Sequence, residues 1–189
     1  MILTGAAITR AVERGEIVID PFEPAQVNPN SYNYRLGSEI FRVTPREDPR
    51  AGVRQEQLEP TGGRYLLRRN QLYLGHTAER IGSTRYVTSL IGRSSIGRLG
   101  LFVQLSADLG HRGAVHRWTL ELLPVLDIYL YPGQILGQVS FWATTGEALP
   151  YRGWYGRHDV PMPSKLLPSE LHRHADRDVT VPRARDAET

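Results

Sequence analysis

Residues 92–100 read Gly-Arg-Ser-Ser-Ile-Gly-Arg-Leu-Gly, and residues 117–123, a short distance further on, read Arg-Trp-Thr-Leu-Glu-Leu-Leu. The first stretch sets two arginines and two serine hydroxyls between glycines. A guanidinium group matches two phosphate oxygens at once, and hydroxyls and glycine-exposed backbone amides add further donors. This composition predicts a phosphate-binding site, although a solvated turn is the plainer alternative for such a stretch.

The second stretch is typical of a β-strand with a single carboxylate in it. Because side chains alternate between the two faces of a strand, Thr119 and Glu121 should point together into a pocket, while Trp118 and the leucines at 120 and 122 pack in the core. A carboxylate among apolar neighbours needs a dedicated partner or an unusual proton affinity. The plainer alternative is an ion pair with an arginine such as Arg98. Together, a phosphate site and a secluded acid favour an enzyme that acts on a nucleotide.

Short apolar runs, many of them separated by Gly and Pro, predict strands along most of the chain. They lie at 17–19, 65–67, 72–77, 86–91, 101–105, 118–123, 128–130 and 138–142. Residues 5–14 predict one short helix, capped by Thr4 and ended by Gly15. Residues 46–63 are polar, with several prolines and glycines, and predict a loop or flap. Many short strands with so little helix predict a mainly β fold, a barrel or a sandwich.

Length and composition limit the remaining possibilities. The chain has 189 residues, a formal net charge of +3, six histidines and no cysteine. We expect one β domain at residues 1–170 and a polar, flexible tail at 171–189. The histidines lack ligand spacing and there is no thiolate, so we expect no zinc. Scattered basic residues predict no nucleic-acid partner, and the lack of a signal or long apolar run predicts a cytoplasmic protein with no membrane partner.

Four segments, in this order, resemble the dCTP deaminase branch of the dUTPase-like superfamily. They are 30–37 (Asn-Ser-Tyr-Asn-Tyr-Arg-Leu-Gly), 92–100, 118–122 and 132–138 (Pro-Gly-Gln-Ile-Leu-Gly-Gln). The resemblance implies a distorted β-barrel with a short N-terminal helix, assembled as a homotrimer with active sites between subunits. It also implies deamination of a cytosine nucleotide, most simply dCTP to dUTP and ammonia, without zinc and with Mg²⁺ bound through the substrate phosphates.

The resemblance further implies roles for single residues. Glu121 would be the general base that activates water for attack on C4 of cytosine, with Ser94 and Arg98 positioning the water and the carboxylate. Nucleotide-binding positions would be Arg93, Ser95, Arg98, Asp108, Thr119, Gln138, Tyr151 and Tyr155. One carboxylate can take a proton from water and then deliver it to the leaving ammonia, so a single secluded acid suits this chemistry.

Two segments depart from the family pattern. In the hairpin between the motifs, His111 stands where the family has an acid, and Asp108 is the nearest substitute. In the C-terminal lid, Trp154 precedes Tyr155 and His158 takes the place of a glutamine. These changes predict a shifted phosphate preference or acceptance of a modified cytosine nucleotide. A dUTPase-type pyrophosphatase, a bifunctional deaminase and pyrophosphatase, and a non-catalytic nucleotide-binding trimer stay open as alternatives.

Overall fold

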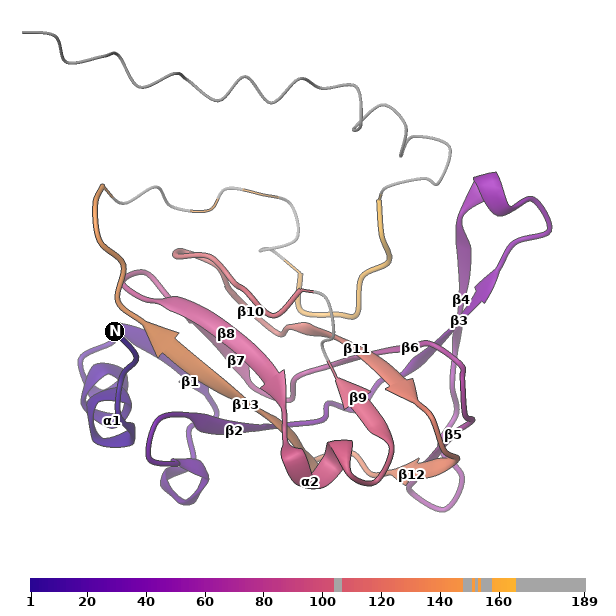
Figure 1. Ribbon diagram of the computed structural model, residues 1–189, viewed down its shortest axis with the longest axis horizontal. Helices are drawn as coiled ribbons and strands as arrows, with labels where there is room; N and C mark the ends of the chain where they lie inside the picture. The colour runs from indigo at the N-terminus through magenta and orange to yellow at the C-terminus, as the bar shows by residue number, and fades with distance from the viewer. Residues whose placement is uncertain (104–106, 148–150, 152, 154–157, 166–189) are drawn as a thin grey trace, which may run out of the picture.

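The structure is a computed structural model that describes residues 1–103, 107–147, 151, 153 and 158–165. These residues are mainly β-strand, with short helical segments at the periphery (Figure 1). The elements, in chain order, are α1 (Gly5–Glu13), β1 (Ile17–Asp20), η1 (Pro24–Gln26), β2 (Tyr32–Arg35), β3 (Phe41–Pro45), η2 (Pro49–Ala51), β4 (Val53–Gln57), β5 (Tyr65–Leu67), β6 (Tyr73–His76), β7 (Arg80–Ser83), β8 (Val87–Gly92), α2 (Ser94–Gly97), β9 (Leu101–Val103), β10 (Val115–His116), β11 (Thr119–Pro124), β12 (Ile128–Leu130) and β13 (Ile135–Trp142).

The strands pair antiparallel and form several small sheets. Within the described residues the strand orders are β4-β3-β6-β11-β9, β2-β13-β8, β1-β7-β10 and β12-β5. In the largest sheet β11 lies between β6 and β9, with Glu121 opposite Leu74 and Leu123 opposite Phe102. Directly opposite residues point to the same face of a sheet, so these four side chains share one face. The predicted mainly β fold is confirmed.

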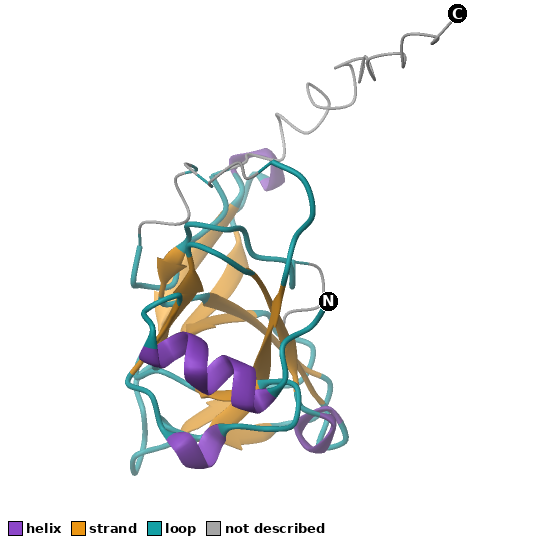
Figure 2. Ribbon diagram, turned by 90° about the vertical axis from the view of Figure 1, so that its left-hand side faces the viewer, coloured by secondary structure: helices purple, strands orange, loops and turns teal. Residues whose placement is uncertain are grey.

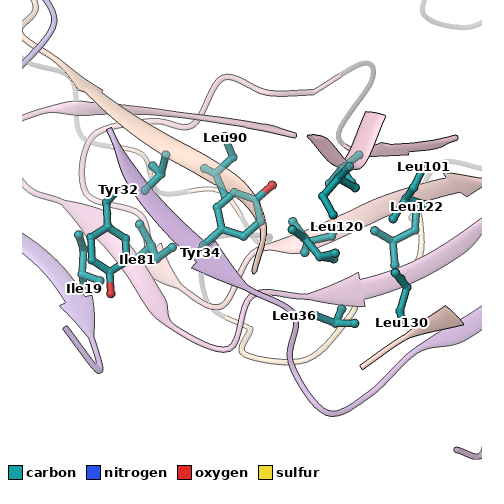
Figure 3. Packing of buried hydrophobic residues seen from close by; sticks show 14 of the residues in the cluster. Ile19, Tyr32, Tyr34, Leu36, Ile81, Leu90, Leu101, Leu120, Leu122 and Leu130 are labelled. Carbon is teal, nitrogen blue, oxygen red and sulfur yellow. The ribbon is translucent and has the colours of Figure 1, made fainter. Parts of the chain in front are cut away.

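The core is built by the other face of β11 and by the strands around it. Leu120 and Leu122 are fully buried and lie among residues such as Leu36, Leu101 and Leu130 (Figure 3). Full burial of such an aliphatic side chain stabilises the fold by roughly 1.5–3 kcal/mol. The alternation predicted for the leucines of this strand is therefore confirmed, and it fixes Glu121 on the opposite side.

Helix α1 has the boundaries that its sequence predicts. The Thr4 side-chain oxygen accepts a hydrogen bond from the Ala7 amide at 3.4 Å, and Gly15 takes a left-handed conformation (φ 68°) just beyond the last turn. Ile8 and Ala11, on the inner face of the helix, are fully buried. The helix lies along the outside of the strands (Figure 2).

The predicted flap at 46–63 is wrong in part, because residues 53–57 form β4. This strand pairs with β3, from Phe41 opposite Gln57 to Pro45 opposite Val53, and the hairpin extends from the body of the molecule (Figure 1). The β4 sequence is mostly polar and no residue in it is buried, so apolar alternation could not reveal it. Strand β7 was also not predicted, because it contains a glycine, which is unusual within a strand. Gly82 stands there because an added Cβ would lie 2.0 Å from the Ala114 carbonyl oxygen.

Residues 166–189 lie outside the described part of the chain, so the predicted domain boundary near residue 170 and the flexible tail stay predictions. No helix in the described ranges has both the length and the apolar character that crossing a membrane requires.

Candidate active site

A pocket of about 720 Å³ opens over the face of β11 that carries Thr119 and Glu121. Three parts of the chain complete its walls. The first is the connecting hairpin (residues 107–116), together with Trp118 and Tyr151. The second consists of four aliphatic residues in or next to the large sheet, namely Val43, Val53, Leu72 and Leu74, and the third is a C-terminal strap (residues 158–164). The predicted pocket therefore exists, and Glu121 is half-buried within it.

Trp118 is a wall of this pocket as well as a support for the core. Its indole N–H donates to the Ile81 carbonyl at 2.9 Å, and its ring lies 4.4 Å, centroid to centroid, from the ring of His116. His116 is itself anchored, because its Nδ1 lies 2.8 Å from the Arg117 carbonyl oxygen. Burial lowers the pKa of His116. The prediction that Trp118 serves only the core was too narrow, since both aromatic rings also face the pocket.

The connecting hairpin is held against β8 through Gly110. The Gly110 amide donates to the Thr88 carbonyl at 2.8 Å. A Cβ at residue 110 would lie 2.2 Å from Thr88 Oγ1 and 2.4 Å from the far edge of the Trp118 indole. Glycine is required here because the indole already fills the space that a side chain would need.

The hairpin turns His111 and Asp108 in different directions. The His111 ring stacks on Tyr151, with centroids 5.1 Å apart, and both residues line the pocket. Asp108 instead accepts a hydrogen bond from the Ser89 hydroxyl at 3.2 Å and is not among the described residues that line the pocket. Asp108 therefore lies outside the pocket that holds Glu121, and its part in nucleotide binding stays a prediction.

The C-terminal strap crosses the pocket and is fixed at two points. The Arg117 amide donates to the Asp159 carboxylate at 2.9 Å, and Arg80 lies 3.4 Å from the same group. Further along, the Met162 amide donates to Thr119 Oγ1 at 3.1 Å. Burial alone would raise the pKa of Asp159, but the Arg117 hydrogen bond and the Arg80 charge outweigh it and lower this pKa.

The arginine and serine motif lies outside this pocket. Arg93 precedes α2, Ser94 and Ser95 form its first residues, and Arg98 follows it. The side chains of Ser94, Ser95 and Arg98 are exposed, Arg93 is half-buried, and none of the four lines the pocket. Among the ion pairs between described residues, none joins Arg98 to Glu121, and the plainer alternative of an arginine partner for Glu121 stays open.

The remaining predicted residues divide between two outcomes. Gln138 belongs to a polar cluster on β13 and β2, where its Oε1 accepts from the Ser31 hydroxyl at 2.7 Å, and it does not line the pocket. Tyr155 lies outside the described residues, as does Trp154. Within the described ranges, no group of three or more histidine, aspartate or glutamate residues is arranged to hold a metal ion.

The fold matches that of a solved protein, which defines its class. The crystal structure of 2′-deoxycytidine 5′-triphosphate deaminase from Agrobacterium tumefaciens superposes with a TM-score of 0.60, at 24% identity, over 74% of this chain and 47% of that chain. At this identity the likeness shows the fold alone, which is the dUTPase-like fold.

Sequence relatives define the family within that class. The model of the dCTP deaminase-like family matches residues 2–144. The "dCTP deaminase, dUMP-forming" of Cytophaga hutchinsonii is 36% identical over 175 residues, which are 92% of this chain and the whole of that relative. The dCTP deaminase of Rhodopirellula baltica is 36% identical over 156 residues, 78% of this chain and 75% of the relative. The chain belongs to the dCTP deaminase-like family of enzymes.

Proposed function

We propose that this protein is a hydrolase that deaminates a cytosine nucleotide, most simply dCTP to dUTP and ammonia. The observation that carries the proposal is the position of Glu121, half-buried on the pocket face of β11 between aromatic walls and an aliphatic floor. The relatives from Cytophaga hutchinsonii and Rhodopirellula baltica are both named dCTP deaminases, which supports the deamination step of the proposal.

In the proposed step the Glu121 carboxylate takes a proton from a water molecule as the water oxygen bonds to C4 of the base. The tetrahedral adduct carries both the new hydroxyl and the amino group on C4. Addition breaks the C4=N3 double bond and leaves its electron pair on N3. Glu121 then delivers the proton to the amino nitrogen, and the C4–N bond breaks with its electron pair leaving on ammonia. The hydroxyl proton moves to N3 as the C4 carbonyl forms. Water and the cytosine nucleotide thus yield ammonia and the uracil nucleotide, and the carboxylate returns to its starting state.

We further propose that the site is completed by a neighbouring subunit of a homotrimer. Ser94 and Arg98 would then approach Glu121 from the neighbour, and Arg93, Ser95 and Arg98 would hold the phosphates and their Mg²⁺. Two facts support this arrangement: the motif is exposed and outside the pocket of its own subunit, and exposed apolar residues surround it. These are Ile91, Leu99, Phe102, Val125 and Leu126, each at least 41% exposed.

A second candidate is deamination combined with release of pyrophosphate. The relatives from Cytophaga hutchinsonii and Clostridium botulinum carry the words "dUMP-forming" in their names. Against it stands the hairpin, where His111 occupies the place of the acid that would activate water near the α-phosphate. The hydrolytic deamination is common to both candidates.

The test is an assay of the purified protein with dCTP, dCMP, CTP and dUTP in the presence of Mg²⁺, with ammonia and pyrophosphate measured separately. We expect ammonia from dCTP in an amount equal to the uracil nucleotide formed. Pyrophosphate in equal amount would select the second candidate. Ammonia from none of the cytosine nucleotides would refute deamination.

A further inference from the structure

The pocket continues beyond Glu121 into an aliphatic compartment. Leu74 lies opposite Glu121 on the neighbouring strand β6, and Leu72 lines the pocket from just before that strand. Val43 and Val53 line it from β3 and β4. Neighbouring strands lie about 4.8 Å apart, so this compartment extends from about 5 to about 15 Å from the carboxylate strand. Figure 1 shows β3 and β4 on this side of the sheet, away from β9.

The compartment has a closed floor and an open rim. Val43 and Leu74 are 7% and 9% exposed, whereas Leu72 and Val53 at the rim are 39% and 42% exposed. The four described residues that line the pocket from these three strands and from the position before β6 are all aliphatic. Such a surface offers no hydrogen bond, and it gains free energy only by contact with an apolar group.

We propose that this compartment receives an apolar substituent on C5 of the base, so that the enzyme also deaminates 5-alkylcytosine nucleotides. The inference rests on the proposed function, which requires C4 of the base to lie beside Glu121. The two ring neighbours of C4 are N3, an acceptor, and C5, which carries only hydrogen in cytosine. Turning N3 toward the aliphatic strands would leave it without a hydrogen bond, so the C5 edge faces them.

The same orientation places the rest of the nucleotide. N1 and its sugar lie across the ring from C4 and point away from the compartment, toward the side where the His111 and Tyr151 rings stack. A methyl group on C5 takes no part in the reaction. Water adds to C4 and ammonia leaves as before, and a 5-methylcytosine nucleotide yields the corresponding thymine nucleotide.

The experiment compares kcat/KM for dCTP, 5-methyl-dCTP and 5-hydroxymethyl-dCTP in the wild-type protein. We expect 5-methyl-dCTP to lie within about tenfold of dCTP, and the hydroxymethyl analogue to be the poorer of the two modified substrates, because its hydroxyl would be buried without a partner. A preference for the hydroxymethyl over the methyl analogue would contradict the aliphatic compartment.

A variant that fills the compartment provides the second test. Leu72→Trp should lower the ratio of kcat/KM for 5-methyl-dCTP to that for dCTP by about tenfold or more. Ile2→Trp is the control, because Ile2 is 40% exposed, like Leu72, and lies outside the pocket. It should leave the ratio unchanged. Calorimetric binding of both nucleotides to the Glu121→Gln protein should show the same change of ratio without turnover.

The outcomes separate the two proposals. If the wild-type protein deaminates dCTP but handles 5-methyl-dCTP more than about a hundredfold less well, or if Leu72→Trp changes both substrates equally, the compartment does not receive the C5 substituent and the proposed function stands. If neither nucleotide releases ammonia, the proposed function fails, and this inference fails with it.

Discussion

Strand β11 and the segment around α2 carry the two groups of residues that the sequence predicts to be functional, yet they differ in their burial and in whether they line the pocket. On β11, buried leucines alternate with Thr119 and Glu121, so the fold itself forms a pocket around the carboxylate. Around α2, only Ile96 is buried, and Ser94, Ser95 and Arg98 face outward. The pocket around Glu121 is thus formed by the described chain itself, whereas the residues of the α2 motif lie outside it.

The largest loss of activity is expected from a mutation in the pocket of β11. Glu121→Gln keeps the shape of the side chain and removes its ability to carry a proton, so kcat for ammonia release should fall by about 10²–10⁴-fold or more. Nucleotide binding should stay within a few-fold. Stopped-time ammonia assays and calorimetry measure the two quantities. Glu13→Gln, an exposed acid at the end of α1, is the control and should match the wild-type protein. Substantial turnover by Glu121→Gln would remove this residue as the base.

Arg98→Ala tests the exposed α2 motif and should lower both nucleotide binding and turnover by about ten- to a hundredfold, because a charged hydrogen-bond partner is worth roughly 1.5–3 kcal/mol.

Mixing the Arg98→Ala protein with the Glu121→Gln protein tests whether the two residues act in one site from different subunits. If each site combines Glu121 of one subunit with Arg98 of its neighbour, a one-to-one mixture reassembled from subunits should recover about a quarter of the wild-type activity. A mixture whose activity after reassembly does not exceed the mean of the two separate variants would place both residues in the same subunit's site.

Gly110→Ala addresses how the pocket wall is packed. The new methyl group would clash with Thr88 and Trp118, so the free energy of unfolding should fall by about 1–3 kcal/mol. Thermal denaturation measures this. Gly97→Ala is the matched control, because a Cβ there meets no atom within 4 Å and its φ is not left-handed. A stability loss of equal size in both variants would mean that the close approach of Gly110 is not the cause.

The smallest effect is expected at the strap. The pKa of Asp159 is lowered in the folded protein, so its hydrogen bond and ion pair stabilise the strap above the ordinary aspartate pKa of about 3.9, and this contribution is lost as the pH falls through the folded-state value. Asp159→Asn should therefore destabilise the protein by well under 1 kcal/mol at neutral pH, since the pair is largely exposed. Denaturation curves of the two proteins should converge in acid. A difference that grows on acidification would contradict this.

The sequence predicted a strand well where the alternation of apolar residues follows from burial of that strand's own side chains. In β11, Leu120 and Leu122 are buried on one face of their own strand, so alternation alone located Glu121 and Thr119 on the face that lines a pocket. Strand β4 has no buried residue, and its position is fixed only by pairing with β3, so its own sequence carried no signal.

The pocket walls were harder to foresee because they depend on contacts between distant segments. His116, Leu72 and Met162 line the pocket, yet no local motif brings them together. The glycine at residue 110 is explained by the Trp118 indole, which fills the space that a side chain there would need. The separation of the α2 motif from Glu121 was not predicted, since composition favoured one joint site and the resemblance implied only that active sites lie between subunits.

The contact between Gly110 and Trp118 also limits the order in which this pocket can change over evolutionary time. A side chain larger than hydrogen at residue 110 overpacks the wall while the indole remains, at a cost of about 1–3 kcal/mol. Replacing the indole first leaves a void beside the glycine, and large-to-small changes of this kind cost about 3–5 kcal/mol when the ring is fully enclosed. Either single step removes a large share of the stability of a typical domain. A lineage that exchanges this wall for another therefore needs a reserve of stability before the first step, or must acquire both substitutions nearly together.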